Sequence, residues 1–212
     1  MGVAENLQQL KSKLPKHITL VAVSKTKSNK TILEAYNQGH STFGENKVQE
    51  LVKKYEDLPK DIHWHMIGHL QSNKVKYIAP FVHLIHGVDS LKLLKEIDKR
   101  GKQNNRIIDC LLQVHIAQEN TKFGFALDEV EDVVEDAEQY KYVNIKGMMG
   151  MASFTTNKTQ IKSEFALLRT LFDNLKNKQL NILSIGMSAD YELAICNGST
   201  MVRVGSAIFG DR

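Results

Sequence analysis

Lys25 is the residue with the clearest capacity for covalent chemistry, because it follows an apolar run, LVAV at 20–23, after a single serine. Such a run is typical of a buried parallel strand. Successive side chains of a strand alternate between its faces, so Val21, Val23 and Lys25 are predicted to share one face. In partly desolvated surroundings a lysine amine loses its proton more easily, and the neutral amine can form a Schiff base with a carbonyl. The alternative is a lysine whose stem lies on the strand while its amine reaches solvent.

Two glycine- and serine-containing segments near the end of the chain have the composition of an anion site. They read GMS at 186–188 and GS at 205–206. Glycine lets backbone N–H groups approach an anion closely, and serine hydroxyls add further donors. In a barrel of alternating strands and helices, phosphate groups are commonly bound by the loops after strands seven and eight. The two segments therefore predict a phosphate site, although each alone is also ordinary turn chemistry.

Arg203 stands within an otherwise apolar segment, MVRVG at 201–205. A buried guanidinium needs a partner, either a carboxylate in a structural ion pair or an atom of a ligand. A small aldehyde that carries a phosphate would use Lys25, the glycine and serine segments and Arg203 together. Pyridoxal 5′-phosphate has this form, with an aldehyde for the lysine, a phosphate for the loops and a ring nitrogen for the arginine.

The elements that must position these residues alternate regularly along the chain. Eight apolar segments predict strands, at about 18–24, 41–43, 62–67, 81–88, 107–116, 143–148, 182–185 and 200–204. Helical spacing predicts helices between them, and a further N-terminal helix over 3–14 that covers one end of the domain. The alternation, without a long linker, predicts an α/β fold, a single (β/α)8 TIM barrel domain over residues 1–212. An open doubly wound sheet is the competing topology, but it usually has a glycine-rich turn after its first strand.

Composition excludes several classes of protein. The 212 residues carry 28 Lys and Arg against 24 Asp and Glu, a net charge of +4, and no basic block interleaved with aromatic residues points to a nucleic-acid partner. Cys110 and Cys196 are far apart in apolar segments, which predicts two buried free thiols in a reducing compartment. The N-terminus resembles neither a signal peptide nor a membrane span, so a cytoplasmic protein without a membrane partner is expected.

Five motifs together are recognisable as those of one family. They are VSKTK at 23–27, FGEN at 43–46, WHMIG and LQSNK within 64–74, SIGMSAD at 184–190 and GSTMVRVGSAIFG at 198–210. In their order and spacing the chain resembles the pyridoxal phosphate homeostasis proteins, single-domain relatives of the alanine racemase barrel, which is fold type III among pyridoxal phosphate-binding proteins. The likeness spans nearly the full length. The chain departs from the family pattern at Ser28, at Lys47 and in the segment 150–152, which lacks a proline that is frequent there; none of these is a proposed contact.

The resemblance implies a role for each candidate residue. It implies that Lys25 forms the Schiff base and that Arg203 faces the pyridine nitrogen. It also implies that Ser188, Gly205 and Ser206 hold the phosphate, with Asn46 nearby in the site. Lys27 and Lys122 match further lysines of the family, which are candidates for handling the cofactor on its way in or out.

The same chemistry argues for a carrier with no catalytic residues of its own. An arginine opposite the ring nitrogen discourages its protonation and weakens the ring as an electron sink. This disfavours transamination, whereas racemisation would still be possible. Racemisation, however, needs a proton donor or acceptor on each face of the substrate, and the chain ends at Arg212 without the second domain that supplies one in racemases. We therefore expect a monomer that buffers pyridoxal phosphate or delivers it through transient contact with apo-enzymes. The alternatives are an amino-acid racemase that uses Tyr36 or His65 as its second base, and an aldolase-like barrel that uses Lys25 on a phosphorylated sugar.

His63, His65 and His69 raise the hypothesis of a metal site, because His63 and His65 share a strand face. A metal site usually also needs carboxylates or supporting hydrogen bonds, for which this segment offers no candidate. We therefore expect no metal.

Overall fold

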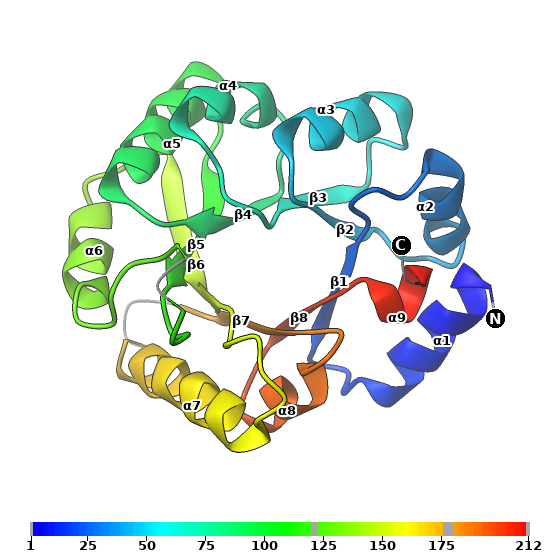
Figure 1. The fold of residues 1–212 in the computed structure, drawn as a ribbon. Helices are drawn as coiled ribbons and strands as arrows, with labels where there is room; N and C mark the ends of the chain where they lie inside the picture. The colour runs from blue at the N-terminus through cyan, green and yellow to red at the C-terminus, as the bar shows by residue number, and fades with distance from the viewer. Residues whose placement is uncertain (1, 120–122, 176–179, 211–212) are drawn as a thin grey trace.

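The computed structural model describes residues 2–119, 123–175 and 180–210. Its eight strands form a closed barrel in which every neighbouring pair is parallel, and strand β1 closes the ring by pairing with β8. Figure 1 looks down this ring and shows the helices around its outside. The predicted (β/α)8 barrel is confirmed, and the open doubly wound sheet is wrong.

The strands are short and lie close to the predicted segments. They are β1 (Thr19–Val23), β2 (Thr42–Glu45), β3 (His63–Met66), β4 (Leu84–Val88), β5 (Ile108–Val114), β6 (Val143–Gly150), β7 (Ile182–Met187) and β8 (Met201–Val204). The largest difference is at the start of β4, which begins three residues later than predicted. The ends of β2, β6 and β7 lie two residues later than predicted, and the end of β5 lies two residues earlier. Apolar content alone does not locate these ends, because hydrogen bonds to the neighbouring strands decide where a strand begins and stops.

The helices occupy the intervals between strands. They are α1 (Val3–Lys13), α2 (Asn29–Tyr36), α3 (Val48–Asp57), the 3-10 turn η1 (Ser72–Lys74), α4 (Val75–Ile78), α5 (Leu91–Gln103), α6 (Val130–Ala137), α7 (Lys158–Asn174), α8 (Tyr191–Cys196) and α9 (Ser206–Phe209). The sequence did not predict α9, which is a single turn. In the part of the chain that the structure describes, no helix is long and apolar enough to cross a membrane.

The N-terminal helix α1 does not cover an end of the barrel as predicted. It lies in the outer helix layer, where it contacts α2 and α9 (Figure 1). The amide of Asn6 donates a hydrogen bond of 3.1 Å to the carbonyl of Ile208 in α9, and Leu7 and Leu10 are buried. Leu7 and Leu10 therefore belong to the same apolar core as Ile208 and Phe209 of α9.

The barrel interior holds a small apolar cluster separate from the larger core between strands and helices. Its buried members are Val21, Leu84, Leu111, Met149 and Met201. Side chains of adjacent strands that are in register point to the same side of a barrel wall. Arg203 is in register with Val21, so it also points into the barrel.

The two cysteines differ in exposure. Cys110 lies on β5 and is buried, as predicted, whereas Cys196 is exposed. Cys196 ends α8, a short helix that buries only Ala194, so the apolar neighbours of Cys196 in sequence do not enclose its thiol. The prediction of two buried thiols is therefore wrong for Cys196.

Candidate functional site

A cavity of about 420 Å³ opens at the carboxyl ends of the strands, within the size range of small-molecule sites. All six residues predicted to contact the cofactor line it, and they come from the ends of β1, β2, β7 and β8: Lys25, Asn46, Ser188, Arg203, Gly205 and Ser206. Strands β7, β8, β1 and β2 are consecutive neighbours in the closed ring. The barrel therefore brings together residues that are up to 181 positions apart in the chain.

Lys25 lies beyond the strand and not on it. Strand β1 ends at Val23, and Lys25 belongs to a turn in which Thr26 has a φ of 65°. Lys25 is half-buried and lines the cavity, as does Val23. Val23 and Lys25 therefore face the same cavity, as predicted. The turn, and not the alternation of side chains along the strand, directs Lys25 there.

Arg203 is buried at the bottom of the cavity and has no carboxylate among its hydrogen-bond partners in the described residues. Its Nη1 donates to the carbonyl and the hydroxyl of Ser184 at 2.7 and 2.6 Å, and its Nη2 donates to the carbonyl of Gly150 at 3.0 Å. Burial lowers the pKa of Arg203 to about 10, partly opposed by Asp190, so the guanidinium stays charged at neutral pH. A guanidinium has five N–H donors, and these three contacts leave donors for a ligand.

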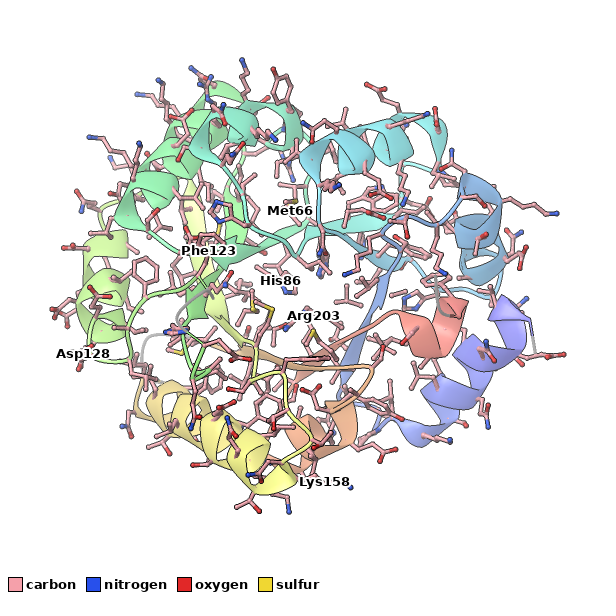
Figure 2. The ribbon with its side chains drawn as sticks, in the orientation of Figure 1. Met66, His86, Phe123, Asp128, Lys158 and Arg203 are labelled. Atoms are coloured by element: carbon pink, nitrogen blue, oxygen red, sulfur yellow. The ribbon has the colours of Figure 1, made fainter. Side chains whose placement is uncertain are left out.

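A chain of hydrogen bonds leads from Arg203 into the barrel interior. The hydroxyl of Ser184 lies 3.3 Å from Nδ1 of His86, and Nε2 of His86 lies 3.0 Å from Nδ1 of His65. Arg203 can only donate, so His86 is the acceptor that the described residues offer to the Ser184 hydroxyl proton. With Nδ1 of His86 accepting that hydrogen bond, the ring donates from Nε2 to Nδ1 of His65. Burial lowers the pKa of His65 to about 3 and that of His86 well below its usual value, so both rings are neutral. Figure 2 shows His86 and Arg203 inside the ring of strands.

The predicted phosphate site combines the ends of β7 and β8. The backbone N–H of Gly205 donates to the hydroxyl of Ser188 at 3.1 Å, which joins the two loops. Ser206 begins α9, and the first turn of a helix leaves N–H groups without partners inside the helix. Gly186 has a φ of 98°, and a Cβ there would lie 2.6 Å from the Cβ of Ala194, so the backbone of this loop requires glycine.

Of the two further lysines that the family resemblance singles out, Lys27 lies at the cavity. Lys27 lines the cavity, and its amine donates to the carbonyls of Phe209 and Gly210 at 3.1 and 3.0 Å. It therefore ties the turn after β1 to the end of α9. Lys122 lies outside the described residues.

The sequence did not predict the apolar residues of the cavity. Ile67, Met151 and Met187 line it from the ends of β3, β6 and β7. Each follows or ends a predicted strand, which is the available signal, since side chains at carboxyl ends of barrel strands face the site. An apolar wall on one side and donors on the other suit a planar ring that carries a phosphate.

The residues that the racemase and metal-site hypotheses would require lie outside the cavity. The hydroxyl of Tyr36 donates to the carboxylate of Asp61 at 2.8 Å, and neither Tyr36 nor His65 lines the cavity. His63 stacks on His83, while His69 pairs with Asp89 at 2.9 Å. Over the described ranges, no group of three or more His, Cys, Asp or Glu side chains is arranged to hold a metal ion.

Comparison with known proteins agrees with the fold. The family model described as "Alanine racemase, N-terminal domain" matches residues 2–212. An alanine racemase from Clostridium difficile 630 is 14% identical with a TM-score of 0.81, and the match covers 100% of this chain and 57% of that one, which shows the fold alone. The chain thus belongs to the class of proteins that share the alanine racemase N-terminal domain.

More similar relatives give the narrower family. The "Pyridoxal phosphate homeostasis protein" of Aquifex aeolicus is 41% identical over 197 residues, 91% of this chain and 86% of that protein. The one of Escherichia coli K12 is 34% identical over 229 residues, 99% of this chain and 97% of that protein. PipY of Synechococcus elongatus, solved with PLP bound, is 35% identical with a TM-score of 0.89 over 98% of this chain and 100% of that one. The chain belongs to the family of pyridoxal phosphate homeostasis proteins.

Proposed function

We propose that this protein binds pyridoxal 5′-phosphate as a Schiff base with Lys25 and takes part in homeostasis of the cofactor, without substantial catalysis. The observation that carries the proposal is the convergence of a lysine amine, a guanidinium with spare donors and the Ser188–Gly205 pair on one cavity. These groups match the aldehyde, the ring nitrogen and the phosphate of the cofactor. The PLP-bound PipY structure, at 35% identity, supports the same ligand.

Each side chain has a distinct task in this proposal. When bound, the cofactor supplies an aldehyde that is reactive toward amines. Lys25 provides the amine, and Ser188 with the backbone at Ser206 binds the phosphate. Asn46 lines the cavity beside Lys25. Arg203 donates to the ring nitrogen and, because it stays charged, keeps a proton off that nitrogen.

The same features support a carrier in preference to a racemase. An unprotonated ring nitrogen withdraws electrons weakly, which disfavours transamination; racemisation stays possible but needs a second base on the other face of the substrate. Tyr36 is bound to Asp61, and His65 is enclosed in the barrel by its bond to His86, so neither reaches the cavity. We therefore propose that the protein holds pyridoxal phosphate for release to apo-enzymes that use it.

The test is an absorption spectrum of the purified protein with pyridoxal phosphate, followed by borohydride reduction and peptide mapping. We expect a yellow protein whose reduced adduct maps to Lys25, no such adduct in Lys25→Ala, and an unchanged adduct in Lys30→Ala, which alters an exposed lysine of α2. A colourless wild-type protein would refute the proposed ligand. Sustained racemisation of amino acids by the pure protein, lost in Lys25→Ala, would refute the carrier role.

A further inference from the structure

A buried charged network lies behind the turn that carries Lys25, between the barrel wall and helix α3. Its centre is Lys54 of α3, which is buried although lysines are almost never enclosed unless paired. The amine of Lys54 donates to three acceptors: the carbonyl of Ser24 at 2.8 Å, Oε1 of Glu45 at 2.8 Å and Oε1 of Glu50 at 2.7 Å. An ammonium has three N–H donors, so these contacts use all of them.

The network holds the backbone on both sides of Lys25. On one side, the hydroxyl of Ser24 donates to Oε1 of Glu45 at 2.6 Å, and the carbonyl of Ser24 accepts directly from Lys54. On the other side, the backbone N–H of Thr26 donates to Oε1 of Glu50 at 2.6 Å. Both neighbours of Lys25 are therefore connected to one ammonium group, either directly or through a carboxylate.

The turn needs such support because of its conformation. Thr26 has a φ of 65°, in the left-handed region that a β-branched residue adopts only at a cost in free energy. The hydrogen bond from its N–H to Glu50 offsets part of this cost. Without it, Thr26 would relax toward negative φ, and the Lys25 side chain would leave its place on the cavity wall.

Stability alone does not account for the network. Glu45 is completely buried, its Oε2 has no hydrogen-bond partner among the described atoms, and burial raises its pKa despite the nearby Lys54. Buried ion pairs often contribute less to stability than apolar residues of the same size, because the charges lose their hydration. A network of this kind is better explained by the backbone conformation that it imposes, and here that is the conformation of the turn that carries Lys25.

We propose that Lys54 is a positioning residue for Lys25: through Ser24, Glu45 and Glu50 it holds the turn 24–26 so that the Lys25 amine points into the cavity. The inference rests on the proposed function, since it concerns the lysine to which the cofactor attaches. Lys54 itself does not line the cavity. Its removal therefore impairs formation of the covalent bond and leaves the phosphate site intact.

The first experiment compares two ligands in Lys54→Met and in the control Lys53→Met, which removes an exposed lysine of the same helix. Pyridoxal 5′-phosphate has the aldehyde that reacts with Lys25, whereas pyridoxine 5′-phosphate carries an alcohol there and cannot react. We expect Lys54→Met to bind the aldehyde about tenfold more weakly, the effect of losing one hydrogen bond to a charged group, and to bind the alcohol as the wild type does. Equal weakening for both ligands would reduce Lys54 to a general structural role and overturn the inference.

The second experiment uses Glu50→Ala, because Lys54→Met leaves two carboxylates unpaired and can prevent folding. The Glu50 side chain is partly exposed, and its removal frees only the Thr26 end of the turn. In the protein without cofactor, we expect amide hydrogen exchange in a peptide covering 24–27 to become at least several-fold faster, with no change in the Lys53→Met control. Unchanged exchange in this peptide would overturn the inference.

The outcomes separate the two proposals. A wild-type protein that yields no borohydride-trapped adduct refutes the proposed function, and with it the role of Lys54 in cofactor attachment. The positioning role alone is refuted if the wild type forms the adduct at Lys25 and the Glu50→Ala variant forms it equally fast and binds pyridoxal phosphate equally tightly.

Discussion

The buried pair His65 and His86 predicts a strong loss of stability in mild acid. Both rings are neutral in the folded protein, and the hydrogen bond from Nε2 of His86 to Nδ1 of His65 requires an unprotonated acceptor. Burial lowers the pKa of His65 from 6.5 to about 3, and that of His86 well below 6.5. In the unfolded chain both residues titrate near their ordinary value.

The sign and size follow from proton linkage. Between pH 6.5 and the folded-state pKa, the unfolded chain binds protons that the folded protein does not, so the free energy of unfolding falls as the pH falls. The contribution is fully present above pH 6.5 and is lost downward from there at about 1.4 kcal/mol per pH unit for each histidine. At pH 5 this amounts to about 2 kcal/mol for His65, and the lowered pKa of His86 acts in the same direction.

The assay is urea unfolding at pH 7 and at pH 5, for the wild type and for His65→Asn. Asparagine can present its amide oxygen near the position of Nδ1, so the hydrogen bond from His86 has an acceptor that does not titrate. We expect the variant to lose about 2 kcal/mol less than the wild type between the two pH values. Glu45, whose raised pKa acts in the opposite direction, affects both proteins equally and cancels in this difference.

The control is His17→Asn, which alters an exposed histidine and is expected to keep the full wild-type loss. The reasoning is refuted if His65→Asn and the wild type lose the same free energy between pH 7 and pH 5. It is also refuted if the wild type is as stable at pH 5 as at pH 7.

Two further predictions concern the C-terminal turn and the barrel wall. The Lys27→Met variant loses the hydrogen bonds to the carbonyls of Phe209 and Gly210. We expect it to bind pyridoxine 5′-phosphate about fivefold more weakly, as measured by calorimetry. An unchanged affinity would show that these hydrogen bonds are not needed to hold α9 in place. In Gly147→Ala, the added Cβ would collide with the carbonyl of Ile182 on β7. We therefore expect the free energy of unfolding, measured with urea, to fall by about 3 kcal/mol. A decrease of less than about 1 kcal/mol would contradict the tight packing of β6 on β7.

Most of the architecture could be predicted from the order of apolar segments. Eight apolar runs with helices between them admit few closed arrangements, because each parallel strand must return through a right-handed crossover. The candidate cofactor residues could be proposed for the same reason, since Lys25, Ser188 and Gly205 all stand where a strand was predicted to end. The structure brings these residues to one cavity, as the barrel prediction requires.

Other features depended on contacts that no local pattern encodes. The turn that directs Lys25 depends on Lys54 of helix α3. Nothing in the sequence distinguishes Lys54 from the many lysines of the surface. The exposure of Cys196 depends on how a short helix lies on its neighbours, and its apolar sequence neighbours gave the wrong prediction.

The sequence by itself therefore determined the barrel, the strand ends that carry the candidate site and the types of chemical group available there. Period and composition are local properties, and burial of apolar surface turns them into strands and helices in a nearly unique order. Only the tertiary structure decided which donors of Arg203 remain for a ligand, which histidines lose their charge and which lysine holds another in place. These properties arise from hydrogen bonds and desolvation between residues far apart in the chain, and such contacts exist only once the barrel has closed.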